Sequence, residues 1–339
     1  MKWIHSESAT GWRPPEDRAP LRVAMIGAGK MARLHSETVR AIPSIVLCGV
    51  SSRTEASASR LQSEFGYERA YTDHRRMLDE LQPDAVFVAV SHATSFEVAC
   101  DVLQRRVPCL LEKPAAYSAV DARVLVDLAE RGRVLTLVAV NRRYYSVVQQ
   151  AALAINQYGP IRGVLVESHE PTLAFRSRMQ FDSWLYDRWL LANSIHAIDL
   201  LRMIGGEVEA LRGFGAAAAE PFGDHFSIAT RHQSGALGTF VAHWNSAGGV
   251  SMKIYGDGVE AELESLESGF VRYATGRRIK IPPDNSDTRF KPGLYAQNVA
   301  FLASVCDNLP APYPASDVAD HCRTIQLVED ILGTVHPEP

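Results

Sequence analysis

Hydrophobic residues in the first part of the chain gather in short continuous runs. Examples between residues 21 and 141 are LRVAMIG, SIVLCGV, DAVFVAV and RVLTLVAV. The segments between them, such as KMARLHSETVRAI, instead place apolar residues with the spacing of one helix face. Strands that are apolar throughout and alternate with helices predict a parallel sheet with both faces covered.

The pattern changes after residue 141. Runs such as IRGVLVESHE, FSIATRHQ and ALGTFVAHWN alternate hydrophobic and polar positions, and glycine-containing turns separate them. This alternation predicts antiparallel strands with one covered face. A helix around SIHAIDLLRMIGG interrupts these strands, and two more helices close the chain.

The two patterns together predict an α/β protein with two domains. We expect residues 21–141 to form a Rossmann domain, a doubly wound parallel sheet that binds a dinucleotide. Residues 142–335 are expected to form a C-terminal α+β domain with a large, mostly antiparallel open sheet, for substrate binding and oligomerisation. The proline-containing residues 1–20 are expected to form a flexible arm, and packing of this arm on a neighbouring subunit is the alternative.

Composition narrows the classes of function. The 339 residues carry a net charge of -4 without a basic cluster, which argues against nucleic acid or an anionic membrane surface as partner. No apolar run approaches the roughly 20 residues of a membrane span, and the N-terminus lacks the apolar region of a signal peptide. The five cysteines are odd in number and without CxxC spacing, so we expect reduced thiols in a cytoplasmic protein. No set of histidine, cysteine and acidic residues has metal-ligand spacing, and we assign no metal.

The first apolar run leads directly into a G-x-G-x-x-A motif that contains Gly27, Gly29, Lys30, Met31 and Ala32. The first glycine permits a tight turn, the second lets the backbone approach a diphosphate, and the alanine keeps the following helix close to the strand. The N-terminus of that helix offers N–H groups and a partial positive charge to the phosphates. A purely structural glycine turn is the alternative.

The end of the second apolar run bears on the choice between NAD and NADP. An NAD site typically has a carboxylate at this position, which binds the ribose hydroxyls. Here the chain reads Ser51, Ser52 and Arg53, and the first acid is Glu55. Small hydroxyls and a guanidinium suit a 2'-phosphate, so we expect NADP, with NAD as the alternative if Arg53 is an ordinary surface residue.

Two charges follow another buried run, VPCLL, in the order Glu112, Lys113 and then Pro114. In an open parallel sheet, ligands bind beyond the carboxyl ends of the strands, so Lys113 could project toward the nicotinamide and the substrate. Partial desolvation beside the cationic oxidised ring should lower its pKa, which suits hydrogen bonding or proton transfer to a hydroxyl. A lysine that only reaches from a strand end to solvent is the alternative.

Taken together, VAMIGAGKMA, the stretch from DAVFVAV to LLEKP, and HAIDLLRMIGG resemble the glucose–fructose oxidoreductase / inositol dehydrogenase / MocA-like family. The resemblance implies a tightly bound nicotinamide cofactor and a carbohydrate-like substrate. It also implies a homodimer or homotetramer formed through the C-terminal sheet. In this family the lysine of E-K-P contacts the reacting oxygen, the histidine of H-x-x-D is the acid/base, and the aspartate binds substrate. These roles map to Lys113, His196 and Asp199.

The cofactor site that we expect combines the glycine turn, the ends of the second and fourth apolar runs, and the E-K-P motif. Its residues are Gly27, Gly29, Lys30, Met31, Ser51, Ser52, Arg53, Ser91, His92, Glu112 and Lys113.

The chain departs from the family pattern near the histidine. Many members carry an aspartate four residues before it to orient the imidazole, and Ala192 stands there. Asn193 is one residue out of phase, which on a helix corresponds to about 100°. Asp187-Arg188-Trp189 replaces a glycine-rich segment, and Ser91 stands where a proline is common. A structural role for His196 is therefore the alternative to catalysis.

The substrate pocket is expected to draw on residues near the catalytic helix and on the end of the last Rossmann strand. Arginines here could hold a phosphate, a nucleotide diphosphate or a carboxylate, and some of them are expected to face water instead. The candidate substrate contacts, besides Asp199, are Arg143, Tyr186, Arg188 and Asn193.

These features favour an NAD(P)-dependent oxidoreductase, with NADP preferred, that interconverts a secondary alcohol and a ketone on a sugar, sugar derivative or cyclitol. His196, assisted by Lys113, would move the hydroxyl proton. Two alternatives remain open. One is a redox-neutral enzyme that retains its cofactor while it eliminates from or epimerises a sugar, and the other is a non-catalytic cofactor-binding regulator.

Overall fold

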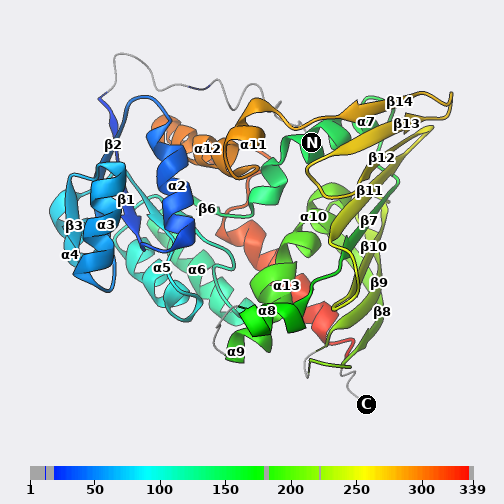
Figure 1. Cartoon of the computed structure of the whole chain (residues 1–339), viewed down its shortest axis with the longest axis horizontal. Coiled ribbons are helices and arrows are strands. Elements are labelled where there is room, and N and C mark those ends of the chain that lie inside the picture. Colours follow the sequence, from blue (N-terminus) through cyan, green and yellow to red (C-terminus); the bar gives the residue numbers. More distant parts are fainter. Residues whose placement is uncertain (1–11, 13–18, 179–182, 221–222, 336–339) are drawn as a thin grey trace. The chain divides into compact units, whose positions relative to one another are not determined.

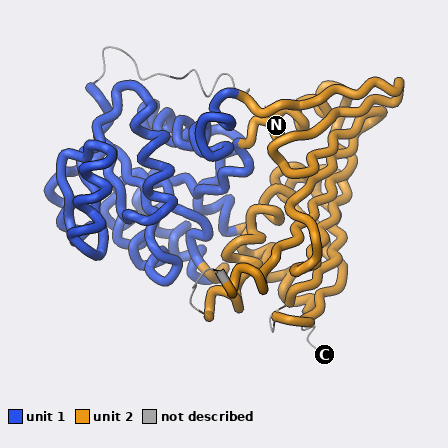
Figure 2. The backbone as a smooth tube through the Cα atoms, viewed as in Figure 1, with its two compact units in different colours: residues 1–116, 120–144, 285–322 blue, residues 117–119, 145–284, 323–339 orange. Residues whose placement is uncertain are grey.

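The computed structural model describes residues 12, 19–178, 183–220 and 223–335. The chain divides into two compact units (Figure 2). Unit 1 contains residues up to 116, residues 120–144 and residues 285–322, and unit 2 contains the rest. Most of the predicted arm lies outside the described residues, but Trp12 is described and packs against the core of unit 1.

Unit 1 is built on a six-stranded parallel sheet in the order β3-β2-β1-β4-β5-β6 (Figure 1). Its strands are β1 (Leu21–Ile26), β2 (Ile45–Ser51), β3 (Arg69–Tyr71), β4 (Ala85–Val88), β5 (Cys109–Leu111) and β6 (Thr136–Val138). Its helices are α2 (Lys30–Arg40), α3 (Glu55–Phe65), α4 (His74–Leu81), η1 (His92–Thr94), α5 (Ser95–Gln104), α6 (Ala119–Gly132), η2 (Asn141–Tyr144), α11 (Asn285–Arg289) and α12 (Leu294–Asp307). This order reverses between β1 and β4, so a ligand crevice is expected where these two strands end.

Local sequence signals set the ends of several of these helices. Thr54 begins α3 by accepting a hydrogen bond from the backbone N–H of Ser57, and Gly66 ends it at a φ of 80°. Asp73 caps α4 in the same way through the N–H groups of Arg75 and Arg76.

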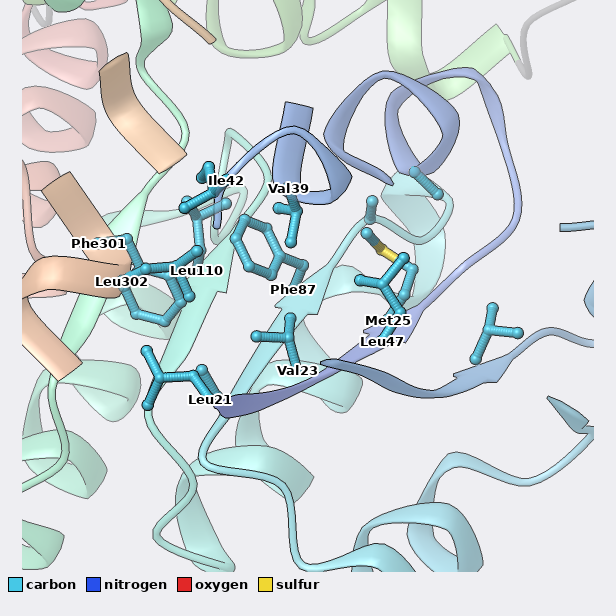
Figure 3. Packing of buried hydrophobic residues seen from close by; sticks show 14 of the residues in the cluster. Leu21, Val23, Met25, Val39, Ile42, Leu47, Phe87, Leu110, Phe301 and Leu302 are labelled. Carbon is cyan, nitrogen blue, oxygen red and sulfur yellow. The ribbon is translucent and has the colours of Figure 1, made fainter. Parts of the chain in front are cut away.

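The core of unit 1 joins segments that are far apart in the sequence. Phe87 of β4 is fully buried, and Phe301 of α12 contacts it edge-on with ring centroids 5.4 Å apart (Figure 3). Leu110 of β5 and Leu302 of α12 belong to the same cluster. Residues 285–322 thus pack with the parallel sheet of unit 1, although the predicted division of the chain at residue 141 groups them with the later strands.

Unit 2 is built on an eight-stranded sheet in the order β14-β13-β12-β11-β7-β10-β9-β8. All neighbouring strands are antiparallel except β7 and β10, which are parallel. The strands are β7 (Gly163–Ser168), β8 (Val208–Ala216), β9 (His225–His232), β10 (Leu237–His243), β11 (Val250–Gly256), β12 (Val259–Leu263), β13 (Gly269–Tyr273) and β14 (Arg278–Ile281). The helices are α7 (Ser146–Asn156), α8 (Thr172–Arg178), α9 (Ser183–Tyr186), the π-helical turn η3 (Leu190–Ser194) and α10 (Ile195–Gly205); α13 (Val318–Leu332) runs along the chain from unit 1 into unit 2.

The eight-stranded sheet has one covered face. In β9, Phe226, Ile228 and Thr230 are buried whereas Ser227 and Ala229 between them are exposed. Helix α10 packs on β7 and β10, and α7 packs on β11, β12 and β13. The predicted fold class, a Rossmann sheet followed by a mostly antiparallel open sheet, is confirmed. Among the described residues no helix combines the length and apolarity needed to cross a membrane.

We expect Leu110→Ala to destabilise the protein by about 2–5 kcal/mol, because the lost side chain leaves a cavity beside Phe87. Leu110 is 1% exposed, whereas Leu309 is 63% exposed, so Leu309→Ala provides a matched control that should change stability by about 0.5 kcal/mol or less. Urea unfolding followed by circular dichroism measures both. Equal losses in the two variants would contradict the described core.

Candidate functional site

The turn between β1 and α2 requires glycine at one position and leaves space at another. Gly27 has a φ of +115°, and a Cβ atom there would lie 2.1 Å from the carbonyl oxygen of Ala89. A Cβ on Gly29 would meet nothing within 4 Å. Gly29 precedes α2 without a capping side chain from the described residues, and the first turn of the helix, from Lys30, contains no acidic residue. The helix therefore presents its N–H groups and positive dipole to open space, which fits a diphosphate.

The end of β2 offers hydroxyls but no carboxylate. Ser51 is buried, and its Oγ has no hydrogen-bond partner among the described residues. The backbone N–H of Ser52 donates to the carbonyl of Tyr71, which fixes the loop. Arg53 is exposed and has no ion-pair partner in the described part of the chain. A buried hydroxyl without a partner beside an exposed guanidinium fits the ribose end of a dinucleotide.

Glu112, the first charge after β5, is held by a histidine that the sequence motifs do not reveal. Nε2 of the fully buried His35 lies 3.0 Å from Oε1 of Glu112, and Nδ1 lies 3.0 Å from Oδ1 of Asn298. Oε2 of Glu112 accepts the backbone N–H of Lys113 at 3.2 Å. Burial raises the pKa of Glu112, but the hydrogen bond and charge of His35, together with Lys113 and Lys291, outweigh burial and hold this pKa below its ordinary value.

Lys113 lies at the crevice end of the parallel sheet, as its place after β5 predicts. It is half-buried, and its charge acts on His92, which follows β4. Burial lowers the pKa of His92, and the positive charge of Lys113 lowers it further against the opposing effect of Glu112. Ser91 shares a hydrogen bond of 3.0 Å with Thr94 and thereby closes the short turn η1. The predicted cofactor residues around β1, β4 and β5 thus gather at one edge of the sheet.

His196 lies in the most buried helix of unit 2. It is 7% exposed, and every other residue of α10 is buried as well. Asp199, one turn later, accepts a hydrogen bond of 3.0 Å from Thr324 of α13 and is 1% exposed. A carboxylate so deeply buried and bonded to a neighbouring helix anchors α10, and we therefore leave Asp199 out of the proposed substrate contacts.

A buried carboxylate, Glu170, organises the π-helical turn that precedes α10. Its Oε1 accepts hydrogen bonds from Ser168 at 3.0 Å and Ser194 at 2.6 Å. Its Oε2 accepts from Nε1 of Trp189 at 2.7 Å and from the amide of Asn193. The side chain of Asn193, predicted to contact substrate, is thus bound inside unit 2. Sequence reasoning missed Glu170 because it follows a strand without any motif.

The guanidinium of Arg143 is bound by other residues of unit 1. It is buried in unit 1, where it pairs with Asp320 at 2.7 Å and donates to the carbonyls of Pro314 and Ala315. Pro314 and Ala315 precede α13 and Asp320 lies in its first turn, all far from Arg143 in the sequence. The geometry does not support the predicted substrate contact of Arg143, because its charge is matched inside the unit.

The remaining predicted substrate residues lie in an aromatic region of unit 2. Tyr186 is buried and stacks on Trp189 with centroids 5.6 Å apart, and the guanidinium of Arg176 lies 4.6 Å from the Tyr186 ring centroid. Arg188 is exposed and lies 5.9 Å from the ring centroid of Trp184. Of the two predicted substrate residues in this region, Tyr186 is buried, whereas the exposed guanidinium of Arg188 can contact a ligand.

Aromatic and histidine rings also pack near the end of β10 in unit 2. Trp244, which follows β10, is buried and packs on Phe226 with centroids 5.9 Å apart. His169 stacks on His243 at 5.9 Å, and its Nε2 lies 3.8 Å from Glu167. Within the described ranges, no group of three or more potential metal ligands converges.

Two family models match the chain. One, described as "Oxidoreductase family, NAD-binding Rossmann fold", matches residues 21–140, and the other, described as "GFO/IDH/MocA C-terminal domain", matches residues 148–261. The first covers the parallel sheet and the second covers β7 to most of β12.

Two curated relatives are dehydrogenases. A myo-inositol 2-dehydrogenase of Thermotoga maritima is 25% identical over 229 residues, which span 64% of this chain and 67% of the relative. A D-apiose dehydrogenase of Paraburkholderia graminis is 30% identical over 231 residues, which span 62% of this chain but only 57% of the relative. A structure of levoglucosan dehydrogenase in complex with NADH and levoglucosan has a TM-score of 0.78 at 17% identity, covering 93% of this chain and 97% of that chain, and so shares the fold.

We expect Glu170→Gln to lower the free energy of unfolding by roughly 2–3 kcal/mol, because one amide cannot accept all the hydrogen bonds that converge on the carboxylate. The matched control is Glu167→Gln near the end of the preceding strand β7, where the side chain is 39% exposed and the expected loss is below about 1 kcal/mol. Chemical denaturation measures both. A loss at Glu170 no larger than at Glu167 would show that Glu170 does not anchor the turn.

Proposed function

Because the chain belongs to the GFO/IDH/MocA oxidoreductase family, we propose that it is an NADP-dependent dehydrogenase acting on a carbohydrate-like substrate. The reaction interconverts a secondary alcohol and a ketone on a sugar, sugar derivative or cyclitol. The observation that carries this proposal is the position of Lys113, half-buried directly after β5 at the edge of the sheet where the Gly27 turn and the N-terminus of α2 also lie.

The nicotinamide cofactor, when bound, supplies the hydride acceptor or donor. The ammonium group of Lys113 then hydrogen-bonds the substrate oxygen and stabilises the negative charge that develops on it. The carboxylate of Glu112 binds His35 and the backbone N–H of Lys113. These hydrogen bonds fix the backbone at Lys113, from which its side chain is proposed to contact the substrate.

His196 is proposed as the acid/base that takes up or returns the hydroxyl proton. Its position on a fully buried helix limits exchange of that proton with water. Ala192 cannot orient the imidazole as the family's aspartate does. Orientation of the segment falls instead to Glu170, which holds Asn193 and Ser194 immediately before α10.

The preference for NADP rests on the end of β2. A carboxylate in this place would bind the ribose hydroxyls of NAD and repel a 2'-phosphate, and no residue from Ser51 to Thr54 is acidic. The exposed Arg53 can form charge-assisted hydrogen bonds to the phosphate.

The substrate is proposed to be a small carbohydrate that contacts Arg188. An assembly through the open face of the eight-stranded sheet is supported by two exposed side chains there, Phe214 at 83% and Leu237 at 64%. The five cysteines are free, which suits the reducing cytoplasm proposed as the site of action.

We expect Lys113→Ala to lower kcat by roughly 10²–10⁴-fold while the affinity for NADPH changes far less, because the lysine acts on the reacting oxygen. His196→Ala should have a similar effect on kcat. Nicotinamide absorbance with a panel of sugars, nucleotide sugars and cyclitols identifies the substrate and measures turnover. The control is Lys280→Ala, an exposed lysine on β14, which should leave kcat unchanged. Normal turnover in Lys113→Ala would refute the proposed role, and product formed without net reduction of cofactor would favour the redox-neutral alternative.

We expect Arg53→Ala to weaken NADPH binding by about tenfold or more and to leave NADH binding nearly unchanged, since the guanidinium contacts only the 2'-phosphate. Fluorescence titration of wild type and variant with each nucleotide provides the four dissociation constants. Arg60→Ala, an exposed arginine further along α3, is the control. Tighter binding of NADH than of NADPH by the wild type would refute the NADP preference.

A further inference from the structure

A lysine far from the Rossmann motifs reaches the start of the phosphate-binding helix. Lys291 lies in the loop between α11 and α12, in the part of unit 1 that follows the last strand of unit 2. Its Nζ lies 3.7 Å from Sδ of Met31, the second residue of α2. The ammonium group is therefore at the first turn of the helix whose N-terminus faces the open space left by Gly29.

The loop that carries Lys291 is held from several sides. Asn141, after the last strand of the parallel sheet, donates its amide to the carbonyl of Pro292 at 2.8 Å. Asp287 of α11 accepts the backbone N–H of Gly293 at 2.6 Å. Phe290 stacks on Tyr295 with centroids 5.2 Å apart and an interplanar angle of 5°. These contacts fix the backbone on both sides of Lys291, so the side chain is directed rather than loosely exposed.

The charges around Lys291 are unbalanced. Burial lowers the pKa of its amine, Glu112 acts in the opposite direction, and Arg142 and Lys30 lower the pKa further. Glu112 already serves His35. Three positive charges, on Lys291, Arg142 and Lys30, therefore act near the positive end of the α2 dipole. This arrangement costs electrostatic free energy unless an anion binds there.

We propose that Lys291 binds the diphosphate of the dinucleotide at the N-terminus of α2. The contact with Met31 favours the diphosphate over the 2'-phosphate, because the latter belongs at the end of β2 beside Arg53. Lys291 thus contributes, from the C-terminal segment, a side-chain contact to the diphosphate from outside the G-x-G-x-x-A motif. This inference rests on the nicotinamide-cofactor site of the proposed function and is independent of which sugar is oxidised.

The test compares ligands that contain or lack the diphosphate. Lys291→Met keeps the length and apolar stem of the side chain and removes its charge; Lys291→Gln is a second neutral variant in case the first fails to fold. Isothermal titration calorimetry is performed with NADPH, ADP-ribose and adenosine. We expect the affinity for NADPH and for ADP-ribose to fall about tenfold, or roughly 1.4 kcal/mol, and the affinity for adenosine to stay unchanged. Lys280→Met is the matched control and should bind all three as the wild type does.

Three results would overturn the inference. ADP-ribose affinity within twofold of wild type would show that Lys291 serves another group, such as an anionic substrate. An equal loss for adenosine would reduce its role to support of the fold. If the wild type binds no nicotinamide nucleotide, the proposed function fails together with this inference, whereas unchanged ADP-ribose binding in the variants refutes the inference alone.

Discussion

The close approach between the β1–α2 turn and the end of β4 is the constraint on which the cofactor site depends. Only a residue without a side chain fits at position 27, because a Cβ atom would lie 2.1 Å from the carbonyl oxygen of Ala89. The turn lets α2 begin at Lys30 with its N-terminus at the crevice edge of the sheet. Lys113 and Lys291 add positive charge near this helix end, a place that already attracts anions.

Two carboxylates stabilise their surroundings in different ways. In unit 1, Glu112 is held by His35 and influences both Lys113 and Lys291. In unit 2, Glu170 gathers four donors around the turn before α10. The first carboxylate shapes the electrostatics of a site, whereas the second shapes the backbone that precedes one. Both lie at the end of a strand.

The fold and the motif-bearing residues could be predicted from the sequence because their signals are local. Continuous apolar runs, alternating runs and the G-x-G-x-x-A turn each lie within one short segment. The surroundings of Arg143, Asp199 and Asn193 could not be predicted, because their partners Asp320, Thr324 and Glu170 are distant in sequence. In the sequence, a polar residue that is buried for structural reasons cannot be told from one that binds substrate until its partners are known. Lys291 escaped notice for the same reason: nothing local connects its loop to α2.

The central proposal is that Lys113 and His196 act on one substrate hydroxyl beside the nicotinamide ring. A crystal structure of the protein with NADP⁺ and a substrate identified in solution tests it most directly. The account predicts the side chains of both residues within about 3 Å of the same substrate hydroxyl, beside the hydride-accepting carbon of the ring. A structure in which either side chain points away from that hydroxyl would contradict it.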